Sequence, residues 1–150
     1  MTDKFIYNDE RFADIEMLRY PLLGFEALTL QQKLYIYCLS EATLYGRDIT
    51  FDQFGRYNLV IRKTLEAVLR HYEGDCTTKD FLGFETYLKQ VWFASGIHHH
   101  YGCEKFVPTF SEDFLRHEVL AIDPEALPLA PGQTAGELLD AICPVLFDPQ

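Results

Sequence analysis

Residues 81–96, FLGFETYLKQVWFASG, are the stretch that decides the fold. Apolar and aromatic side chains recur in it at intervals of three and four, which is the period of an α-helix with one buried face. Gly96 is the residue at which such a helix is expected to end. The residues predicted to form the buried face are Phe81, Phe84, Leu88, Val91 and Trp92. This largely aromatic face predicts a mainly α-helical protein.

The segment that follows this helix contains three of the five histidines, in the string Gly96-Ile97-His98-His99-His100-Tyr101. Helical periodicity is lost from here until Ser111, so we expect the chain to run across the surface. Imidazoles are costly to bury in their charged form, and they should therefore lie near water or be hydrogen-bonded. Loops on a rigid scaffold often carry binding residues, which makes the string a candidate site.

The N-terminal third is predicted to contain an arm and two helices. Residues 1–8 should form a loose arm, and residues 9–20 carry apolar side chains at helical spacing (Phe12, Ile15 and Leu18) before Pro21 and Gly24. Thr29 and Gln32 form a capping-box pattern, which predicts a helix that continues to Gly46. Its apolar stripe is Leu30, Leu34, Tyr37, Cys38 and Ala42. Residues 47–55 are expected to be an ordered surface loop held by Phe51 or Phe54.

Three further helices are predicted around and after residues 81–96. Asn58 is expected to cap one that ends at Gly74, with Arg62, Lys63 and Arg70 in solvent. Ser111 is expected to cap another that ends at Asp123, with Phe114, Leu115, Val119 and Leu120 facing inward. A second capping box, Thr134 with Glu137, should open a short helix over 134–142 that Pro144 closes. The apolar end after Pro144 is expected to lie against residues beyond the given sequence.

These patterns predict the fold class and the organisation of the chain. The class is mainly α, an irregular multi-helix domain of about five or six helices. Residues 1–150 form a single helical region, in which 1–123 are the main helical core. Residues 124–133, with three of the seven prolines, form a Pro-rich linker, and 134–150 form the short helix and its end.

Composition excludes some classes of function. The net charge of −10 argues against a phosphate-tracking surface and hence against nucleic acid as a partner. No stretch approaches the roughly 20 apolar residues of a membrane span. The four cysteines, Cys38, Cys76, Cys103 and Cys143, form no CxxC pair and follow no signal peptide, which favours reduced thiols in a cytoplasmic protein. Two disulfides are possible by count, but buried thiols are the expectation.

No complete catalytic or metal constellation is present. Consecutive histidines point in different directions, so at most two of the three could bind one ion. His117-Glu118 lacks the second histidine of a His-Glu-x-x-His zinc helix. Cys103 near His99 and His100 invites a nucleophile reading, but sequence spacing alone does not bring such a pair together. We assign no catalytic residue and no metal ligand.

Four strings in the chain are distinctive: residues 12–20 (FADIEMLRY), 46–53 (GRDITFDQ), 91–101 (VWFASGIHHHY) and 104–108 (EKFVP). Together they resemble the N-terminal region of bacterial dipeptidyl peptidase III. The resemblance runs through nearly the whole chain from Phe12 to Pro149. It is strongest in the GIHHHY string and the KFVP that follows.

That resemblance implies a function for a longer protein. The family consists of two-lobed zinc metallopeptidases that remove dipeptides from the N-terminus of short peptides. Its His-Glu-x-x-x-His zinc motif and downstream acidic motif are absent here, so the chain resembles the N-terminal part of the zinc-free lobe. Zinc and short peptides are implied for the full-length enzyme, with the remainder of the polypeptide as this chain's partner. The chain alone is expected to be inactive.

The residues we assign to a substrate-cleft wall are His98, His99, His100 and Tyr101. An equally open reading is that these imidazoles only satisfy loop backbone groups. The alternative function is a freestanding helical interaction module that binds a partner through the 97–110 loop. An open reading frame that continues with a His-Glu-x-x-x-His segment favours the peptidase, and a stop codon after Gln150 favours the module.

Overall fold

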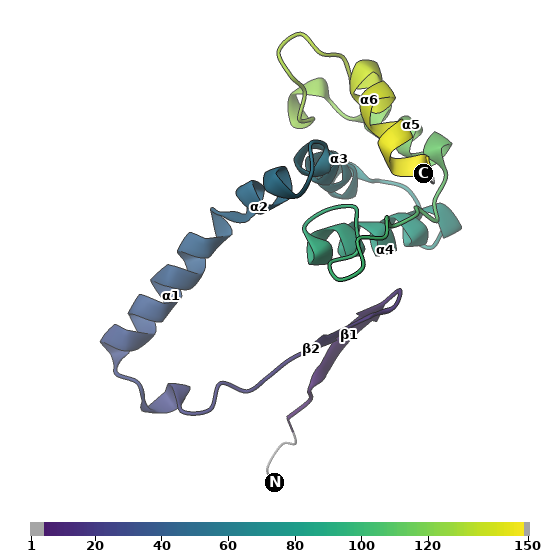
Figure 1. The fold of residues 1–150 in the computed structure, drawn as a ribbon. Helices are drawn as coiled ribbons and strands as arrows, with labels where there is room; N and C mark the ends of the chain where they lie inside the picture. The colour runs from purple at the N-terminus through teal and green to yellow at the C-terminus, as the bar shows by residue number, and fades with distance from the viewer. Residues whose placement is uncertain (1–4, 149–150) are drawn as a thin grey trace. The chain divides into compact units, whose positions relative to one another are not determined.

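The computed structural model describes residues 5–148 and confirms a mainly α-helical chain, to which it adds one antiparallel β-hairpin (Figure 1). No helix within residues 5–148 has both the length and the apolar content needed to cross a membrane. The elements, in chain order, are β1 (Asn8–Phe12), β2 (Ile15–Leu18), the 3-10 helix η1 (Phe25–Ala27), α1 (Leu30–Leu44), α2 (Arg47–Phe54), α3 (Asn58–His71), α4 (Lys79–Ala94), α5 (Glu112–Ala121), η2 (Pro124–Ala126) and α6 (Ala135–Phe147).

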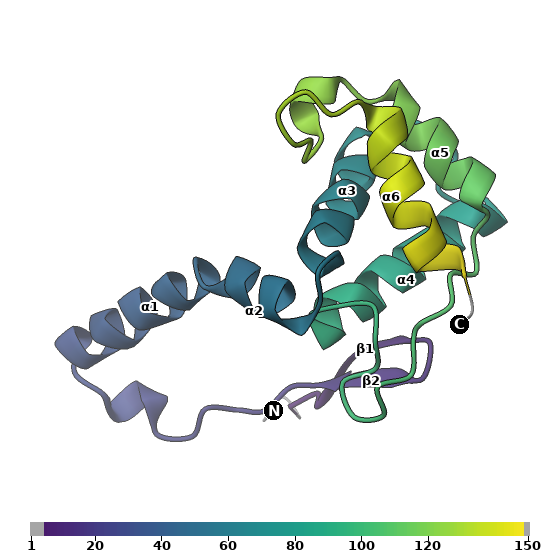
Figure 2. The ribbon, with the colours of Figure 1, turned by 45° about the horizontal axis from the view of Figure 1, so that its top comes forward.

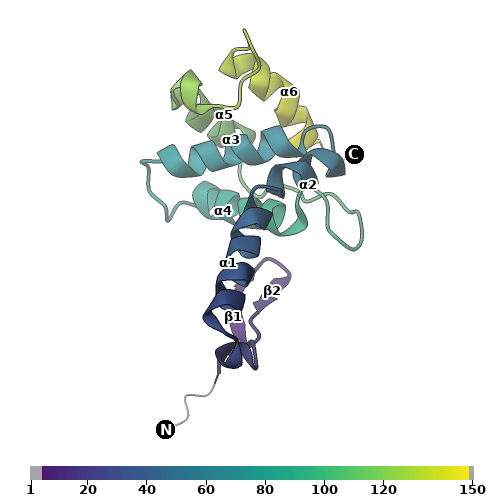
Figure 3. The same cartoon turned by 90° about the vertical axis from the view of Figure 1, so that its left-hand side faces the viewer.

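Backbone contacts divide the chain into two compact units, residues 1–50 and residues 51–150. The second unit holds the hydrophobic core, to which α3, α4, α5 and α6 all contribute buried side chains. Helix α3 packs on α4 and on α5, and α5 packs on α6 (Figures 2 and 3). The aromatic face predicted for residues 81–96 lies in this core, with Phe84, Leu88 and Val91 almost fully buried. The sequence therefore located the centre of the core correctly.

The helix predicted over residues 9–20 is wrong, because this segment forms the β1–β2 hairpin. Phe12 pairs directly with Ile15 across a turn at Ala13 and Asp14, and both apolar side chains are buried. A two-residue turn makes residues i and i+3 neighbours, just as one helical turn does, so the spacing could not separate the two structures. Of the predicted arm, residues 1–4 lie outside the described residues and Asn8 already belongs to β1.

The capping box that opens α1 is confirmed. Gln32 donates its backbone N–H to Thr29 Oγ1 at 3.3 Å, and the Thr29 N–H donates to Gln32 Oε1 at 2.9 Å. The predicted apolar residues lie on this helix, but apolar side chains are not confined to one face and no residue of α1 is buried. The capping box therefore predicted correctly where α1 begins, although none of its residues is buried.

The surface loop predicted over residues 47–55 is also wrong, since residues 47–54 form α2. Eight residues without glycine or proline lie between Gly46 and Gly55, and Asp48 stands favourably in the first turn. Phe51 is buried whereas Phe54 is 67% exposed, so Phe51 is the aromatic that anchors the segment.

Asn58 does not cap α3, contrary to the prediction. Tyr57 precedes the helix and Asn58 is its first residue. The buried Asn58 side chain instead accepts the backbone N–H of Ile97 at 3.3 Å. Helix α3 ends at His71, and Arg62, which we expected in solvent, is buried.

Helix α4 ends at Ala94, two residues before the predicted end at Gly96. Ser95, not Gly96, takes the left-handed conformation, with φ 58°. Gly96 is needed for a different reason, since a Cβ there would lie 2.4 Å from Asn58 Nδ2. The absence of a side chain at Gly96 therefore allows the chain to pass close to Asn58 of α3 directly after α4.

The C-terminal quarter belongs to the core. Ser111 caps α5 as predicted, although Leu120 is exposed rather than inward-facing. In the expected Pro-rich linker, Leu127 is buried in the core cluster. The Thr134–Glu137 capping box is confirmed.

Pro144 does not close α6, which continues to Phe147. Pro144 lies on the exposed side of the helix, where the carbonyl that loses its partner is near water. Leu146 beyond it is buried in the core of the same unit, although we expected the apolar end to lie against later residues. Tertiary burial of the last turn outweighs the local cost of the proline.

The four cysteines are free thiols, but only one fits the expectation of buried small hydrophobes. Cys38, Cys76 and Cys103 are exposed, and Cys143 is buried in α6. Burial raises the pKa of the Cys143 thiol to about 11.

Candidate functional site

The histidine string lies in a short ordered loop at the end of α4. Its two ends are buried, because Ile97 and Phe106 both belong to the core cluster, and the Phe106 N–H donates to the Ile97 carbonyl at 2.8 Å. His98 and Lys105 form an antiparallel bridge, and the Lys105 ammonium donates to the carbonyl of Asp148 at the end of α6. The loop is thus fixed to the second unit at its base.

His99 has a structural role within this loop. Its backbone N–H donates to the Glu104 carbonyl at 2.7 Å, and its carbonyl accepts from the Cys103 N–H at 3.0 Å. Its ring Nδ1 lies 3.2 Å and 3.4 Å from the N–H groups of Tyr101 and Gly102. Backbone N–H groups only donate, so Nδ1 accepts and the neutral ring carries its proton on Nε2. His99 therefore fits the alternative in which the imidazole accepts hydrogen bonds from backbone N–H groups of its own loop.

His98, His100 and Tyr101 present their side chains to solvent. The His100 ring stacks on His99 with centroids 4.5 Å apart and meets Phe93 edge-on at 4.9 Å. Tyr101 is 87% exposed, and its ring centroid lies 4.2 Å from that of His100. The structure brings the rings of residues 99, 100 and 101 together, with hydrogen-bonding nitrogen and hydroxyl groups at their edges.

This arrangement is suited to binding rather than to catalysis. Exposed imidazole and phenol rings can stack on a ligand and exchange hydrogen bonds with peptide groups. Cys103 lies exposed in the same loop, and its φ of 60° belongs to the left-handed region. Within residues 5–148, no group of three or more His, Cys, Asp or Glu side chains is placed to hold a metal ion. We therefore derive no zinc-dependent step from this chain.

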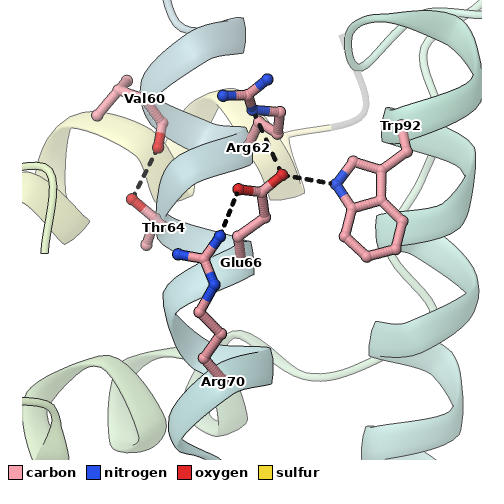
Figure 4. Close-up of polar contacts among 6 residues, drawn as sticks. All are labelled: Val60, Arg62, Thr64, Glu66, Arg70 and Trp92. Atoms are coloured by element: carbon pink, nitrogen blue, oxygen red, sulfur yellow. Dashed lines mark hydrogen bonds and ion pairs between the residues drawn. The ribbon is translucent and has the colours of Figure 1, made fainter. Parts of the chain in front are cut away.

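A second polar cluster joins α3 to α4, and the sequence analysis missed it (Figure 4). Glu66 Oε1 accepts the Trp92 indole N–H at 2.9 Å and lies 3.5 Å from Arg62 Nε. Glu66 Oε2 lies 3.3 Å from a terminal nitrogen of Arg70. Arg62 also places its guanidinium carbon 4.7 Å from the centroid of the Phe51 ring. The Glu66 carboxylate thus connects α3 to α4, and Arg62 links this cluster to Phe51, the buried aromatic residue of α2.

Two signals in the sequence could have indicated this cluster. Arg62, Glu66 and Arg70 follow one another at intervals of four, which places them on one face of a helix. Trp92 is the only tryptophan, and a half-buried indole needs an acceptor for its N–H. The burial of Arg62 could not be read from this spacing, because it depends on Phe51 and on the α4 contact.

The chain matches no protein-family profile, and no curated protein matches it.

Proposed function

We propose that this chain is the N-terminal part of the zinc-free lobe of a dipeptidyl peptidase III-like exopeptidase. In that enzyme it supplies helical scaffold and a wall of the substrate cleft. The four sequence strings that resemble the family support the proposal, and the mainly α-helical fold is compatible with it. The zinc ligands belong to other parts of the proposed enzyme.

The observation that carries the proposal is that the three histidines of the GIHHHY string differ in their contacts. If its histidines served the loop alone, each would be expected to bond loop backbone groups. His99 does so through Nδ1, whereas His98 and His100 are exposed to solvent, and the ring of His100 lies beside that of Tyr101. A rigid base with exposed polar rings is the arrangement expected for a loop that contacts a peptide.

The composition of α1 adds support. Apolar side chains are exposed on all of its sides, which is typical of a helix that is buried in a larger protein. These residues are Leu30, Leu34, Tyr35, Ile36, Tyr37, Leu39 and Leu44. Additional polypeptide or another protein would cover them in the proposed enzyme.

A specific observation also favours the alternative, an interaction module that binds through the 97–110 loop. Tyr101 and Val107 are 87% and 61% exposed, and such side chains commonly contribute to protein interfaces. The two functions differ in the size and chemistry of the native gene product. The peptidase requires a much longer polypeptide that contains zinc.

An antibody raised against residues 51–150 can separate them in the native source. We expect it to isolate a polypeptide far larger than 17.4 kDa that contains zinc and releases dipeptides from a dipeptidyl arylamide. Isolation of a 17.4 kDa product in complex with another protein would contradict the peptidase and establish the module. A long product without zinc or dipeptide release would also contradict the peptidase.

Single histidine variants of the isolated enzyme test the cleft wall. We expect His98→Ala and His100→Ala to lower kcat/KM and leave the melting temperature unchanged. His99→Ala should lower the melting temperature, because the N–H groups of Tyr101 and Gly102 lose their acceptor. If the first two variants retain full catalytic efficiency, the loop is not a cleft wall.

A further inference from the structure

A hollow of about 340 Å³ lies beside the polar cluster of α3 and is independent of the histidine loop. Its volume is within the range of small-molecule sites, about 300–1,000 Å³. One wall consists of side chains from a single face of α3, and the other is formed by the last residue of η2 and the two residues that follow it. The lining residues are Arg62, Lys63, Glu66, Arg70, Ala126, Leu127 and Pro128.

The α3 wall is positively charged in an acidic protein. Three cationic side chains and one carboxylate line it, which leaves two positive charges in excess although the chain has a net charge of −10. Both oxygens of Glu66 already have partners in Trp92, Arg62 and Arg70. The Arg62 side chain is only 6% exposed, so its charge is weakly screened by water.

Arg70 has donors for a further acceptor. Its side chain is 69% exposed, and the contact with Glu66 uses one terminal nitrogen of a guanidinium that carries five N–H groups. A guanidinium fork matches the two oxygens of a carboxylate. The α3 wall can therefore receive an anionic head group.

The opposite wall offers no backbone donor. The N–H groups of Ala126 and Leu127 already donate to the carbonyls of Asp123 and Pro124, at 2.9 Å and 3.2 Å, and Pro128 has no N–H. Phosphate sites are commonly built from several converging backbone N–H groups, which this wall does not provide. The side chains of this wall, from alanine, leucine and proline, suit an apolar body.

We infer that the hollow binds a small carboxylate with a short aliphatic body. The carboxylate lies against Arg70 and Arg62, and the aliphatic body lies against residues 126–128. A neutral amide of the same shape lacks the charge that the α3 wall recognises. Inorganic phosphate has the charge but no apolar body.

Isovalerate is a suitable probe for the 150-residue chain, with isovaleramide and inorganic phosphate as matched comparisons. Amide chemical shifts measured by NMR during titration should show saturable binding of isovalerate at millimolar concentration, with the largest changes on α3 and at Ala126 and Leu127. Isovaleramide should produce no saturable change, and phosphate should bind more weakly. Equal binding of the amide, tighter binding of phosphate, or no saturable binding of isovalerate would each overturn the inference.

Two variants and one control locate the site. Arg70→Gln removes a charge-assisted contact and should weaken isovalerate binding about tenfold. Ala126→Asp places a like charge at the exposed end of the apolar wall and should abolish binding. Arg116→Gln, which changes the charge equally at a site paired with Glu112 and Asp140, should have no effect. If Arg116→Gln weakens binding as much as Arg70→Gln does, the effect is one of net charge and the site is refuted.

Discussion

Helices α1 and α6 begin with the same kind of cap but differ in how far their side chains are buried. Each opens with a complete capping box, Thr29 with Gln32 and Thr134 with Glu137. Helix α6 buries five side chains in the core of the second unit, whereas α1 buries none. The difference teaches that capping residues determine where a helix begins, while its burial depends on which other elements pack against it.

The two helical cysteines provide the largest expected contrast between these helices. Cys38 on α1 is exposed, whereas Cys143 on α6 is 1% exposed and burial raises its pKa to about 11. The thiolate is the reactive form, and the buried thiol must first be uncovered by local or global unfolding. We expect Cys143 to be alkylated at least about a thousandfold more slowly than Cys38.

Timed alkylation followed by mass spectrometry of tryptic peptides measures both rates in one sample. Labelling in concentrated urea is the control, since both thiols should then react at similar rates. Similar rates in the native protein would show that α6 is not held in the core and would remove the contrast.

A pair of leucine variants tests the same comparison through stability. Leu139→Ala leaves a cavity in the core and should lower the free energy of unfolding of the second unit by about 2–5 kcal/mol. Leu34→Ala removes a 54% exposed side chain and should change it by less than about 0.5 kcal/mol. Urea unfolding followed by the fluorescence of Trp92, the only tryptophan, reports on the second unit. An equal loss in Leu34→Ala would show that α1 contributes to the same cooperative core.

Much of the helical fold could be predicted from local chemistry. Side-chain caps at Thr29, Ser111 and Thr134 are confirmed, because each bond joins residues three positions apart. The hairpin was missed because Phe12 and Ile15 meet equally well across a turn or along a helix. The end of α6 was missed because the packing of Leu146 outweighs Pro144. These errors arise where a distant contact determines which local structure forms.

The candidate site was predicted only in part. The sequence located the histidine loop, but the separate role of His99 depends on the direction of two backbone N–H groups. The Arg62–Glu66–Trp92 cluster required a contact between residues 26 positions apart. Neither arrangement follows from periodicity, which describes one element at a time.

The smallest expected effect concerns the one chemical difference between the two capping boxes. In α6 the Thr134 N–H and hydroxyl donate to Glu137 Oε2 at 2.8 Å and 3.0 Å, and these bonds lower the pKa of Glu137. A lowered folded pKa means that the stabilising contribution is present above the ordinary carboxyl pKa. It is lost as the pH falls through the folded value. In α1 the corresponding acceptor is Gln32, which does not titrate.

We therefore expect acidification to loosen the N-terminus of α6 and leave that of α1 unchanged. The amide resonance of Thr134 should move with a midpoint below the ordinary pKa of a glutamate, while that of Thr29 stays constant. NMR spectra recorded from neutral to acid pH measure both in one titration. Glu137→Gln converts the α6 box into the α1 type and should abolish the movement at Thr134, because the amide still accepts the bond but cannot be protonated. If the Thr134 amide resonance moves equally with pH in that variant, another group is responsible for the movement. The two capping boxes then do not differ in their response to acid.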